Sequence, residues 1–288
     1  MRWSERRTRF RALFAGDRCV HPGSVFDPLS ARIAEELGFE AGMFAGSVAS
    51  LTVLGAPDLI VLTLSEFAEQ AYRINRAGEL PLMVDADHGY GNALSVTRTV
   101  EELEAAGVAG LSIEDTLLPQ PFGSLDKAQL ISIEEGAGKM RAALAGRRDP
   151  KLLIAGRTSA VSIAGIDDAM RRIAAYEAAG VDAIFLIGVK TKEQLQALRG
   201  AVKLPFILGG AGPEIMDLDY LSAMGVRLCL QSHAPFMAAV QATYDTLKAL
   251  RDGTPPKELK GVATPETMKR LTRAADYRAW TEDFLGGS

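Results

Sequence analysis

Two aspartates separated by one residue follow an apolar run in the segment VDADHGYGN, residues 84 to 92. Because side chains alternate along an extended strand, Asp85 and Asp87 are expected to project from the same side of it. Two carboxylates on one face repel each other unless a proton or a cation lies between them. Glu114 comes near the end of the next β-rich segment, GLSIED (110 to 115), and brings a third carboxylate if the two strands are parallel neighbours.

The type of these ligands favours a hard divalent cation. Oxygen ligands without a histidine or cysteine cluster are typical of Mg2+ or Mn2+ sites. The alternative is that the acids cap the following helices or form ion pairs with arginines. Because Glu114 reaches the same end of the adjacent strand, we favour a metal site formed by Asp85, Asp87 and Glu114.

Polar residues also end three other apolar segments. Gly46 and Ser47 follow one of them, and a hydroxyl with free backbone N–H groups is suited to binding a carboxylate. Arg157 emerges from LLIAGRT (152 to 158) with a bidentate fork for an anionic substrate, and His233 follows LCLQS (228 to 232). Taken singly, Ser47 fits a helix cap, Arg157 an internal ion pair and His233 a core histidine. Together, at the ends of different strands, they favour a binding site.

The elements that position these residues alternate between strand and helix. Eight β-rich segments occur at 24 to 26, 41 to 46, 80 to 87, 110 to 115, 152 to 158, 183 to 188, 204 to 210 and 228 to 232. Most are continuous apolar runs, as expected of parallel strands covered by helices. Segments with helical spacing lie between them, such as 64 to 78, 96 to 107 and 166 to 180. Eight such repeats predict an α/β fold, a (β/α)8 TIM barrel.

Length and composition set the remaining expectations. With 288 residues and 48% hydrophobic residues, the chain is expected to form one barrel domain over 1–288, with a C-terminal helical tail at about 253–288. A formal charge of -4 with scattered basic residues indicates a small-molecule partner, without nucleic acid or membrane. No apolar run approaches the roughly 20 residues needed to cross a bilayer. Two cysteines indicate a reducing, cytoplasmic setting, and with His21 they are expected to be structural.

In combination, these motifs resemble the isocitrate lyase / phosphoenolpyruvate mutase superfamily. The similarity runs from about residue 10 to about residue 245 and rests on the segments SVFDPLSARIAEELGFEAGMFAGSVAS, APD, DADHGYGN, SIED and GRTSA. It implies a (β/α)8 barrel with Mg2+ near Asp85, Asp87 and Glu114, a carboxylate grip at Ser47 and the neighbouring backbone, and a substrate arginine at Arg157. It also implies that C-terminal helices are exchanged between subunits, giving a homotetramer built from two helix-swapped dimers.

The loop after the fourth strand distinguishes the branches of this superfamily. It reads TLLPQPFGSLDKAQLIS here, without the cysteine motif of isocitrate and methylisocitrate lyases or the K-N-S motif of the mutase branch. Asp58 matches the aspartate of the A-P-D segment that the mutase branch uses in catalysis. The chain is most similar to the oxaloacetate decarboxylase branch, which implies that His233 binds substrate. Whether the loop from 117 to 132 acts as a lid is left open.

Loss of CO2 from a 2-oxo dicarboxylate suits these residues. The reaction needs stabilisation of the enolate that remains, which Mg2+ supplies as a Lewis acid. Arg157, Ser47 and backbone N–H groups would orient the substrate, and water or His233 would protonate the enolate. No cysteine acid is needed, because CO2 leaves without a proton.

Other functions stay open. The alternatives are a carbon-carbon lyase of the methylisocitrate or dimethylmalate type, phosphoenolpyruvate mutase or phosphonopyruvate hydrolase chemistry, and a barrel without catalytic activity. In LGGAG (208 to 212), the glycines Gly209, Gly210 and Gly212 fit either a phosphate site or, in preference, a tight turn. Gly156 stands where the superfamily more often has a bulkier residue, and it is expected to reshape the pocket.

Overall fold

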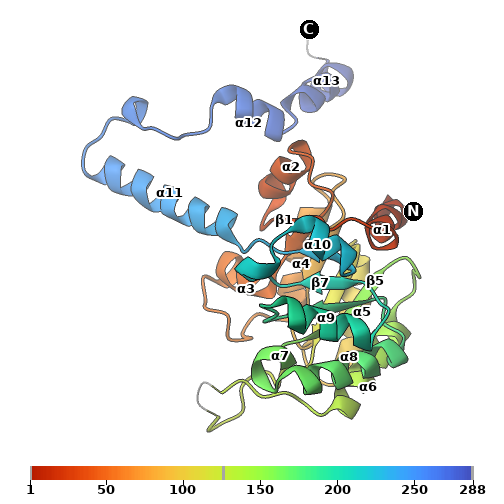
Figure 1. Cartoon of the computed structure of the whole chain (residues 1–288). Coiled ribbons are helices and arrows are strands. Elements are labelled where there is room, and N and C mark those ends of the chain that lie inside the picture. The colour runs from red at the N-terminus through yellow and green to blue at the C-terminus, as the bar shows by residue number, and fades with distance from the viewer. Residues whose placement is uncertain (1, 125–126, 287–288) are drawn as a thin grey trace. The chain divides into compact units, whose positions relative to one another are not determined.

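A computed structural model describes residues 2–124 and 127–286 of the chain (Figure 1). The chain divides into two compact units, Met1–Ser232 and His233–Ser288. The second unit begins before residue 253, where the helical tail was expected to start, because the helix Ala234–Arg251 also belongs to this unit. The organisation as a single barrel domain stays a prediction.

Eight parallel strands form the sheet of the first unit, in sequence order. They are β1 (Gly23–Ser24), β2 (Gly42–Phe44), β3 (Leu82–Asp85), β4 (Gly110–Glu114), β5 (Leu153–Thr158), β6 (Ala183–Leu186), β7 (Phe206–Leu208) and β8 (Val226–Cys229). Each overlaps or adjoins a segment expected from the sequence. Val20, just before β1, bridges to Leu228 of β8, with the Cys229 N–H donating to the Val20 carbonyl at 3.0 Å. This contact closes the sheet, so the (β/α)8 barrel is confirmed.

Helices surround the strands of this unit (Figure 1). They are α1 (Arg2–Ala15), α2 (Pro28–Glu36), α3 (Gly46–Ala49), the π-helical turn η1 (Ser50–Leu54), α4 (Leu64–Asn75), α5 (Ala93–Ala105), α6 (Ile133–Gly146), α7 (Ala160–Ile163), α8 (Ile166–Ala179), α9 (Lys192–Ala201), the 3-10 turn η2 (Pro213–Ile215) and α10 (Leu218–Ala223). Capping boxes start three of them, at Asp27, Thr63 and Thr191, and satisfy N–H groups that a helix leaves unpaired.

The barrel has an inner and an outer apolar layer. Met83, Phe185 and Ile207 belong to the inner cluster, whereas the outer cluster includes side chains such as Val84 that face the helices. Phe10 of α1 is fully buried in the inner cluster, and a Cβ at Gly110 would lie 2.5 Å from its ring. Gly110 begins β4, so α1 covers the end of the barrel where the strands start. The opposite end is left for chemistry.

The second unit consists of α11 (Ala234–Arg251), the 3-10 turn η3 (Pro256–Glu258), α12 (Pro265–Leu271) and α13 (Ala274–Leu285). The helices after residue 253 agree with the helical tail expected from the sequence. No residue of α11 is buried, and Tyr244 and Leu247 are 64% and 62% exposed. In neither unit is a described helix both long and apolar enough to cross a membrane.

Candidate active site

The segment after β3 is a left-handed turn. Asp85 is the last strand residue, and Asp87 already has φ 48. Gly89 and Gly91 also have positive φ, 79 and 148, which accounts for glycine at both positions. Asn92 then accepts hydrogen bonds from N–H groups of α5 and begins that helix. The premise that strand alternation aligns the two aspartates was therefore wrong, because the strand ends before Asp87.

The turn nevertheless places Asp87 beside the other predicted site residues. A Cβ at Gly46 would lie only 2.5 Å from Oδ2 of Asp87 and 2.7 Å from Oδ1, so this carboxylate lies directly against the start of α3. The Glu114 N–H donates to the Asp87 carbonyl at 2.8 Å. The backbone of β4 thus fixes the turn that carries Asp87.

Buried hydroxyls orient two of the carboxylates. Ser112 is fully buried on β4, and its Oγ donates to Oδ1 of Asp85 at 3.0 Å. Thr116 donates to Oε2 of Glu114 at 2.9 Å. Asp85 is 8% exposed and Glu114 is 5% exposed, so both carboxylates are largely shielded from water.

Mutual repulsion perturbs these acids. Burial raises the pKa of Asp87 well above its ordinary value, and the carboxylates of Asp85, Glu114 and Asp58 raise it further. Burial also raises the pKa of Glu114, against the lowering effect of Arg157, and Asp85 adds to the rise. Burial and the neighbouring carboxylates therefore both favour the neutral, protonated form of Asp87 and Glu114.

Arg157 is the cation of this cluster. Its guanidinium pairs with Asp85 through Nη1, and its Nε lies 3.6 Å from Oε2 of Glu114. It also lies over the ring of Phe185 at 5.4 Å. Burial alone would lower the pKa of Arg157, but the neighbouring carboxylates raise it overall. These pairs match the alternative considered for Arg157, an internal ion pair, and its substrate role stays a prediction.

The acids of this site suit a divalent cation by their charge and their oxygen ligands, but they are not arranged as a ligand set. In residues 2–124 and 127–286, no three His, Cys, Asp or Glu side chains form a ready set of metal ligands. Two of the predicted ligands, Asp85 and Glu114, are paired with Arg157 instead. Four carboxyls, from Asp58, Asp85, Asp87 and Glu114, interact here with the Arg157 guanidinium. An oxygen-only set with excess negative charge is what Mg2+ or Mn2+ would neutralise.

The remaining predicted residues occupy different places. Ser47 is the second residue of α3, whose N-cap is Ala45, so Ser47 is not that helix's cap. Asp58 lies on an exposed segment, and partial burial followed by repulsion from Asp85 raises its pKa. His233 is the first residue of the second unit and the N-cap of α11, and is described with that unit. Its role toward the acids stays a prediction.

Several residues near the acids were missed in the sequence. Ser112 lies two positions before Glu114, so strand alternation would have placed both on one face. Lys139 of α6 is 3% exposed and donates from Nζ to the carbonyl of His88 at 2.9 Å, which ties the helix to the left-handed turn. Burial, and then the charge of Lys139, lower the pKa of His88 to about 4. A lysine on the apolar face of α6 was the available signal.

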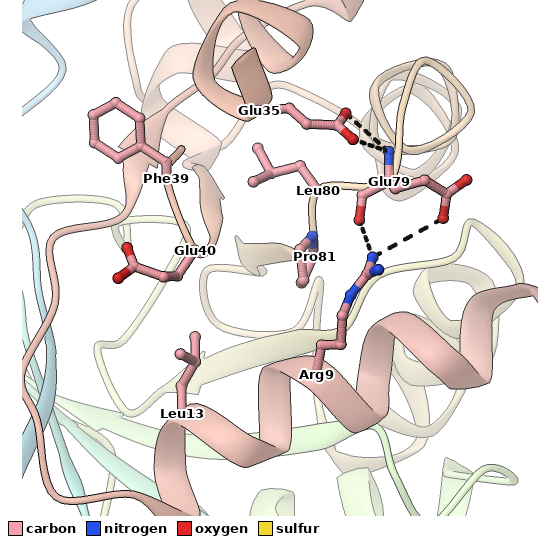
Figure 2. Close-up of a pocket in the computed structure, with 8 residues that line it drawn as sticks. All are labelled: Arg9, Leu13, Glu35, Phe39, Glu40, Glu79, Leu80 and Pro81. Carbon is pink, nitrogen blue, oxygen red and sulfur yellow. Dashed lines mark hydrogen bonds and ion pairs between the residues drawn. The ribbon is translucent and has the colours of Figure 1, made fainter. Parts of the chain in front are cut away.

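One cavity lies away from the acids. A cavity of about 350 Å3 is lined by Arg9, Leu13, Glu35, Phe39, Glu40, Glu79, Leu80 and Pro81. Leu80 and Pro81 immediately precede β3, so this cavity lies at the end of the barrel where strands begin. Figure 2 shows Glu35 and Arg9 both directed toward Glu79, whose N–H donates to Glu35 at 2.9 Å. Arg9, Glu35 and Glu79 pair with one another, Glu40 pairs with Arg18, and these groups do not converge on a reacting centre.

A second cavity, of about 400 Å3, adjoins the ends of β7 and β8 and includes Gly209 and Gly210. A Cβ at Gly209 would lie 2.2 Å from Ile187, and one at Gly212 would lie 2.7 Å from the Lys190 carbonyl. Gly210 has φ 143. Close packing and turn geometry therefore account for these glycines, in agreement with the preferred interpretation of a tight turn.

Gly156 does not shape the pocket as expected from the sequence. A Cβ at this position would lie 3.0 Å from Cδ2 of Tyr176 and 3.3 Å from the sulfur of Met140. Both residues belong to helices outside the barrel, α8 and α6. The missing side chain therefore makes room for helix packing behind β5.

Known proteins resemble the chain along its whole length. The family model described as phosphoenolpyruvate phosphomutase matches residues 10–251. A curated protein of Rhodopseudomonas palustris (strain BisB18), named oxaloacetate decarboxylase, is 58% identical over 286 residues, with 99% of each chain covered. A protein of the same name from Bradyrhizobium diazoefficiens is 57% identical, again with 99% of each covered.

Solved structures give the same result. Oxaloacetate acetylhydrolase in complex with the inhibitor 3,3-difluorooxalacetate matches with a TM-score of 0.86 and 30% identity, covering 99% of this chain and 98% of that one. Phosphonopyruvate hydrolase in complex with oxalate and Mg2+ matches with a TM-score of 0.84 and 27% identity, covering 97% and 99%. The superfamily expected from the motifs is confirmed, and the names of the curated relatives agree with the expected branch. The chain belongs to the phosphoenolpyruvate mutase family.

Proposed function

We propose that the protein is a lyase that decarboxylates oxaloacetate, or a close 2-oxo dicarboxylate, to pyruvate and CO2 with the help of Mg2+ or Mn2+. The observation that carries the proposal is the cluster of carboxyls at the ends of β3 and β4, in which burial and mutual repulsion raise the pKa of Asp87 and Glu114. The full-length relatives named oxaloacetate decarboxylase support the choice of substrate.

Asp85, Asp87 and Glu114 would hold the cation. When bound, it supplies Lewis-acid stabilisation of the negative charge that develops as CO2 leaves. The protein contributes orientation of its ligands, because Ser112 and Thr116 fix one oxygen each on Asp85 and Glu114. The Mg2+ present in the related phosphonopyruvate hydrolase structure supports this assignment.

Arg157, Ser47 and the backbone at Gly46 would bind the substrate carboxylate next to the ketone. Arg157 is suited to this because a guanidinium binds a carboxylate through two parallel hydrogen bonds. The ring of Phe185 lies under the guanidinium and restricts its orientation. Substrate held in this way would direct its second carboxylate away from the cation site, so that this group is free to leave as neutral CO2.

Proton transfer to the remaining carbanion is assigned to Asp58 or His233. Asp58 fits the role of proton donor because its raised pKa keeps the acid form populated to higher pH than an ordinary aspartate. His233 has the side-chain chemistry to bind the substrate or to donate the same proton. Single substitutions at the two positions would assign the roles, because loss of the donor lowers kcat more than it raises KM.

A carbon-carbon lyase is the second candidate. It is favoured by the match to oxaloacetate acetylhydrolase and by a 28% identical match to 2,3-dimethylmalate lyase with a TM-score of 0.83. The products distinguish the candidates, because decarboxylation of oxaloacetate gives pyruvate and CO2, whereas hydrolysis of the same acid gives oxalate and acetate. Hydrolysis of phosphonopyruvate would give pyruvate and inorganic phosphate.

The test is product analysis with oxaloacetate, with and without chelator, for the wild type and Asp85→Ala. We expect cation-dependent pyruvate release that Asp85→Ala reduces by at least about 100-fold, because a metal ligand is lost. Asp167→Ala, an exposed change on α8, is the matched control and should leave the rate unchanged. Each rate is compared with that of the same solution without protein. Equal enzyme-dependent rates of pyruvate release with and without chelator would contradict the proposal.

We also propose a cytoplasmic homotetramer formed from two helix-swapped dimers. The exposed apolar residues along α11, among them Met237, Val240, Tyr244 and Leu247, support helix exchange because such a surface requires a partner. Two buried free cysteines, Cys19 and Cys229, agree with a reducing compartment.

A further inference from the structure

Tyr176 of α8 occupies a space that two glycines leave open. Its side chain is fully buried. A Cβ at Gly136 of α6 would lie 2.5 Å from the Tyr176 hydroxyl oxygen, and a Cβ at Gly156 of β5 would lie 3.0 Å from Cδ2 of the ring. Any larger residue at either position would have to displace the ring or the backbone. The absence of a side chain at both positions therefore leaves room for the ring behind β5.

The hydroxyl of this tyrosine joins a buried ionic network. It donates to Oδ2 of Asp115 at 2.6 Å, and Nη1 of Arg172 lies 3.2 Å from the same oxygen. Asp115 is fully buried, and Arg172 is 6% exposed. Asp168 holds Nε of Arg172 at 2.5 Å and so fixes the guanidinium on α8. A buried carboxylate with partners of this kind has little freedom to move.

The network also holds the returning end of the loop after β4. Nη1 of Arg172 donates to the Ile131 carbonyl at 2.9 Å, and the Ile131 N–H donates to the Asp115 carbonyl at 2.9 Å. Next to them, the Leu117 N–H donates to the Gln129 carbonyl at 2.8 Å. The residues on both sides of the loop are therefore joined at its base, beside Glu114.

The contacts of Tyr176 adjoin two site residues in the sequence. Asp115, which accepts its hydroxyl, immediately follows Glu114, and Gly156, which contacts its ring, immediately precedes Arg157. Glu114 and Arg157 are partners in the register of β4 and β5. One side chain from outside the barrel therefore contacts the residues next to both strand ends.

We propose that Tyr176 and Arg172 are positioning residues of the active site, which hold Glu114 and Arg157 at the separation needed for cation and substrate binding. They touch neither ligand and act through Asp115 and Gly156. This inference rests on the proposed function, because it assigns the network a purpose in the same site. The competing explanation is that the network only stabilises the packing of α8 on the barrel.

Cation binding separates the two explanations. Mn2+ binding, followed by electron paramagnetic resonance of the free ion, is measured for the wild type and Tyr176→Phe, and kcat and KM are measured with oxaloacetate. Phenylalanine keeps the ring and removes only the hydroxyl. We expect the Mn2+ Kd to rise about tenfold and kcat to fall by a similar factor, as is typical when a group orienting a ligand is lost. Arg172→Lys should change both quantities in the same direction, because lysine keeps the charge but loses the fork that joins Asp115, Asp168 and the Ile131 carbonyl.

The matched control is Ile173→Val, a fully buried neighbour on the same helix. It should lower the melting temperature to an extent comparable with Tyr176→Phe and leave the Mn2+ Kd and kcat within about twofold. If Tyr176→Phe lowers the melting temperature but leaves Kd and kcat unchanged, as the control does, the positioning role is refuted. If the wild type binds no Mn2+, the proposed function fails instead, so the two failures are distinct.

Discussion

Gly46→Ala tests whether the place of the Asp87 carboxylate is set by contact with α3. The added Cβ would lie 2.5 Å from Oδ2 and 2.7 Å from Oδ1, so the carboxylate would have to retreat by about 0.9 Å to reach the 3.4 Å of an ordinary contact. Its backbone cannot easily follow, because Asp87 has φ 48 and its carbonyl accepts the Glu114 N–H at 2.8 Å. The side chain must therefore rotate within the acid cluster.

The cost follows from that displacement. A catalytic group misplaced by about 1 Å lowers the rate by roughly 100-fold, which corresponds to about 2.7 kcal/mol of transition-state stabilisation. We expect Gly46→Ala to lower kcat/KM for cation-dependent turnover of oxaloacetate by that factor. The Kd for Mn2+ should also rise, because the same carboxylate is a proposed ligand.

Steady-state kinetics and Mn2+ titration measure these effects, with circular dichroism to confirm the fold. Gly200→Ala on α9 is the matched control, because a Cβ there has no heavy atom within 4 Å. It should leave kcat/KM unchanged and stabilise the protein by about 0.5 kcal/mol through helix propensity. Wild-type kinetics for Gly46→Ala would refute the reasoning that this contact positions Asp87.

Three further predictions concern other parts of the chain. Burial raises the pKa of Cys19 to about 12 and of Cys229 to about 11, so native protein at pH 8 should react slowly with thiol reagents and quickly once unfolded in urea; fast labelling of native protein would contradict this. Because the pKa of His88 is about 4 when folded and 6.5 ordinarily, the unfolded chain binds a proton that the folded chain lacks between those values, and the free energy of unfolding should fall as pH drops. Urea unfolding of His88→Gln should show a weaker pH dependence of the free energy of unfolding, by an amount equivalent to up to one bound proton. The same pH dependence as in the wild type would exclude His88 as its source. Replacing Tyr244 and Leu247 with lysine should shift the protein to smaller species in analytical ultracentrifugation. An unchanged sedimentation profile would show that the exposed face of α11 has no role in assembly.

Most of the fold could be predicted because the sequence patterns that identify strands and helices are local. Apolar runs bounded by polar ends identified all eight strands, and a C-terminal helical tail from about residue 253 was also expected. The short helix α3 and the π-helical turn η1 after β2 escaped prediction, because each is too short to establish a period. The start of the second unit at His233, ahead of α11, depends on tertiary contacts that no local pattern records.

The acids of the site were identified by residue type, but the geometry behind them was not. Strand alternation stops at Asp85, and the left-handed turn brings Asp87 back toward Gly46 by a path that the sequence signals only through its glycines. The buried partners Ser112, Lys139 and Tyr176 come from a strand and two helices, and their convergence depends on strand register and helix packing.

The charge of the cluster explains why Arg157 lies where it does. Each buried carboxylate needs a positive partner, and within the described barrel Arg157 is the guanidinium that Asp85 and Glu114 share. It leaves Asp87, whose pKa is raised well above its ordinary value, without comparable compensation. Arg172 also pairs with two acids, Asp115 and Asp168, whereas Arg157 interacts with the three carboxyls of Asp85, Glu114 and Asp87. The raised pKa of Asp87 and the number of acids around Arg157 support the proposed cation site.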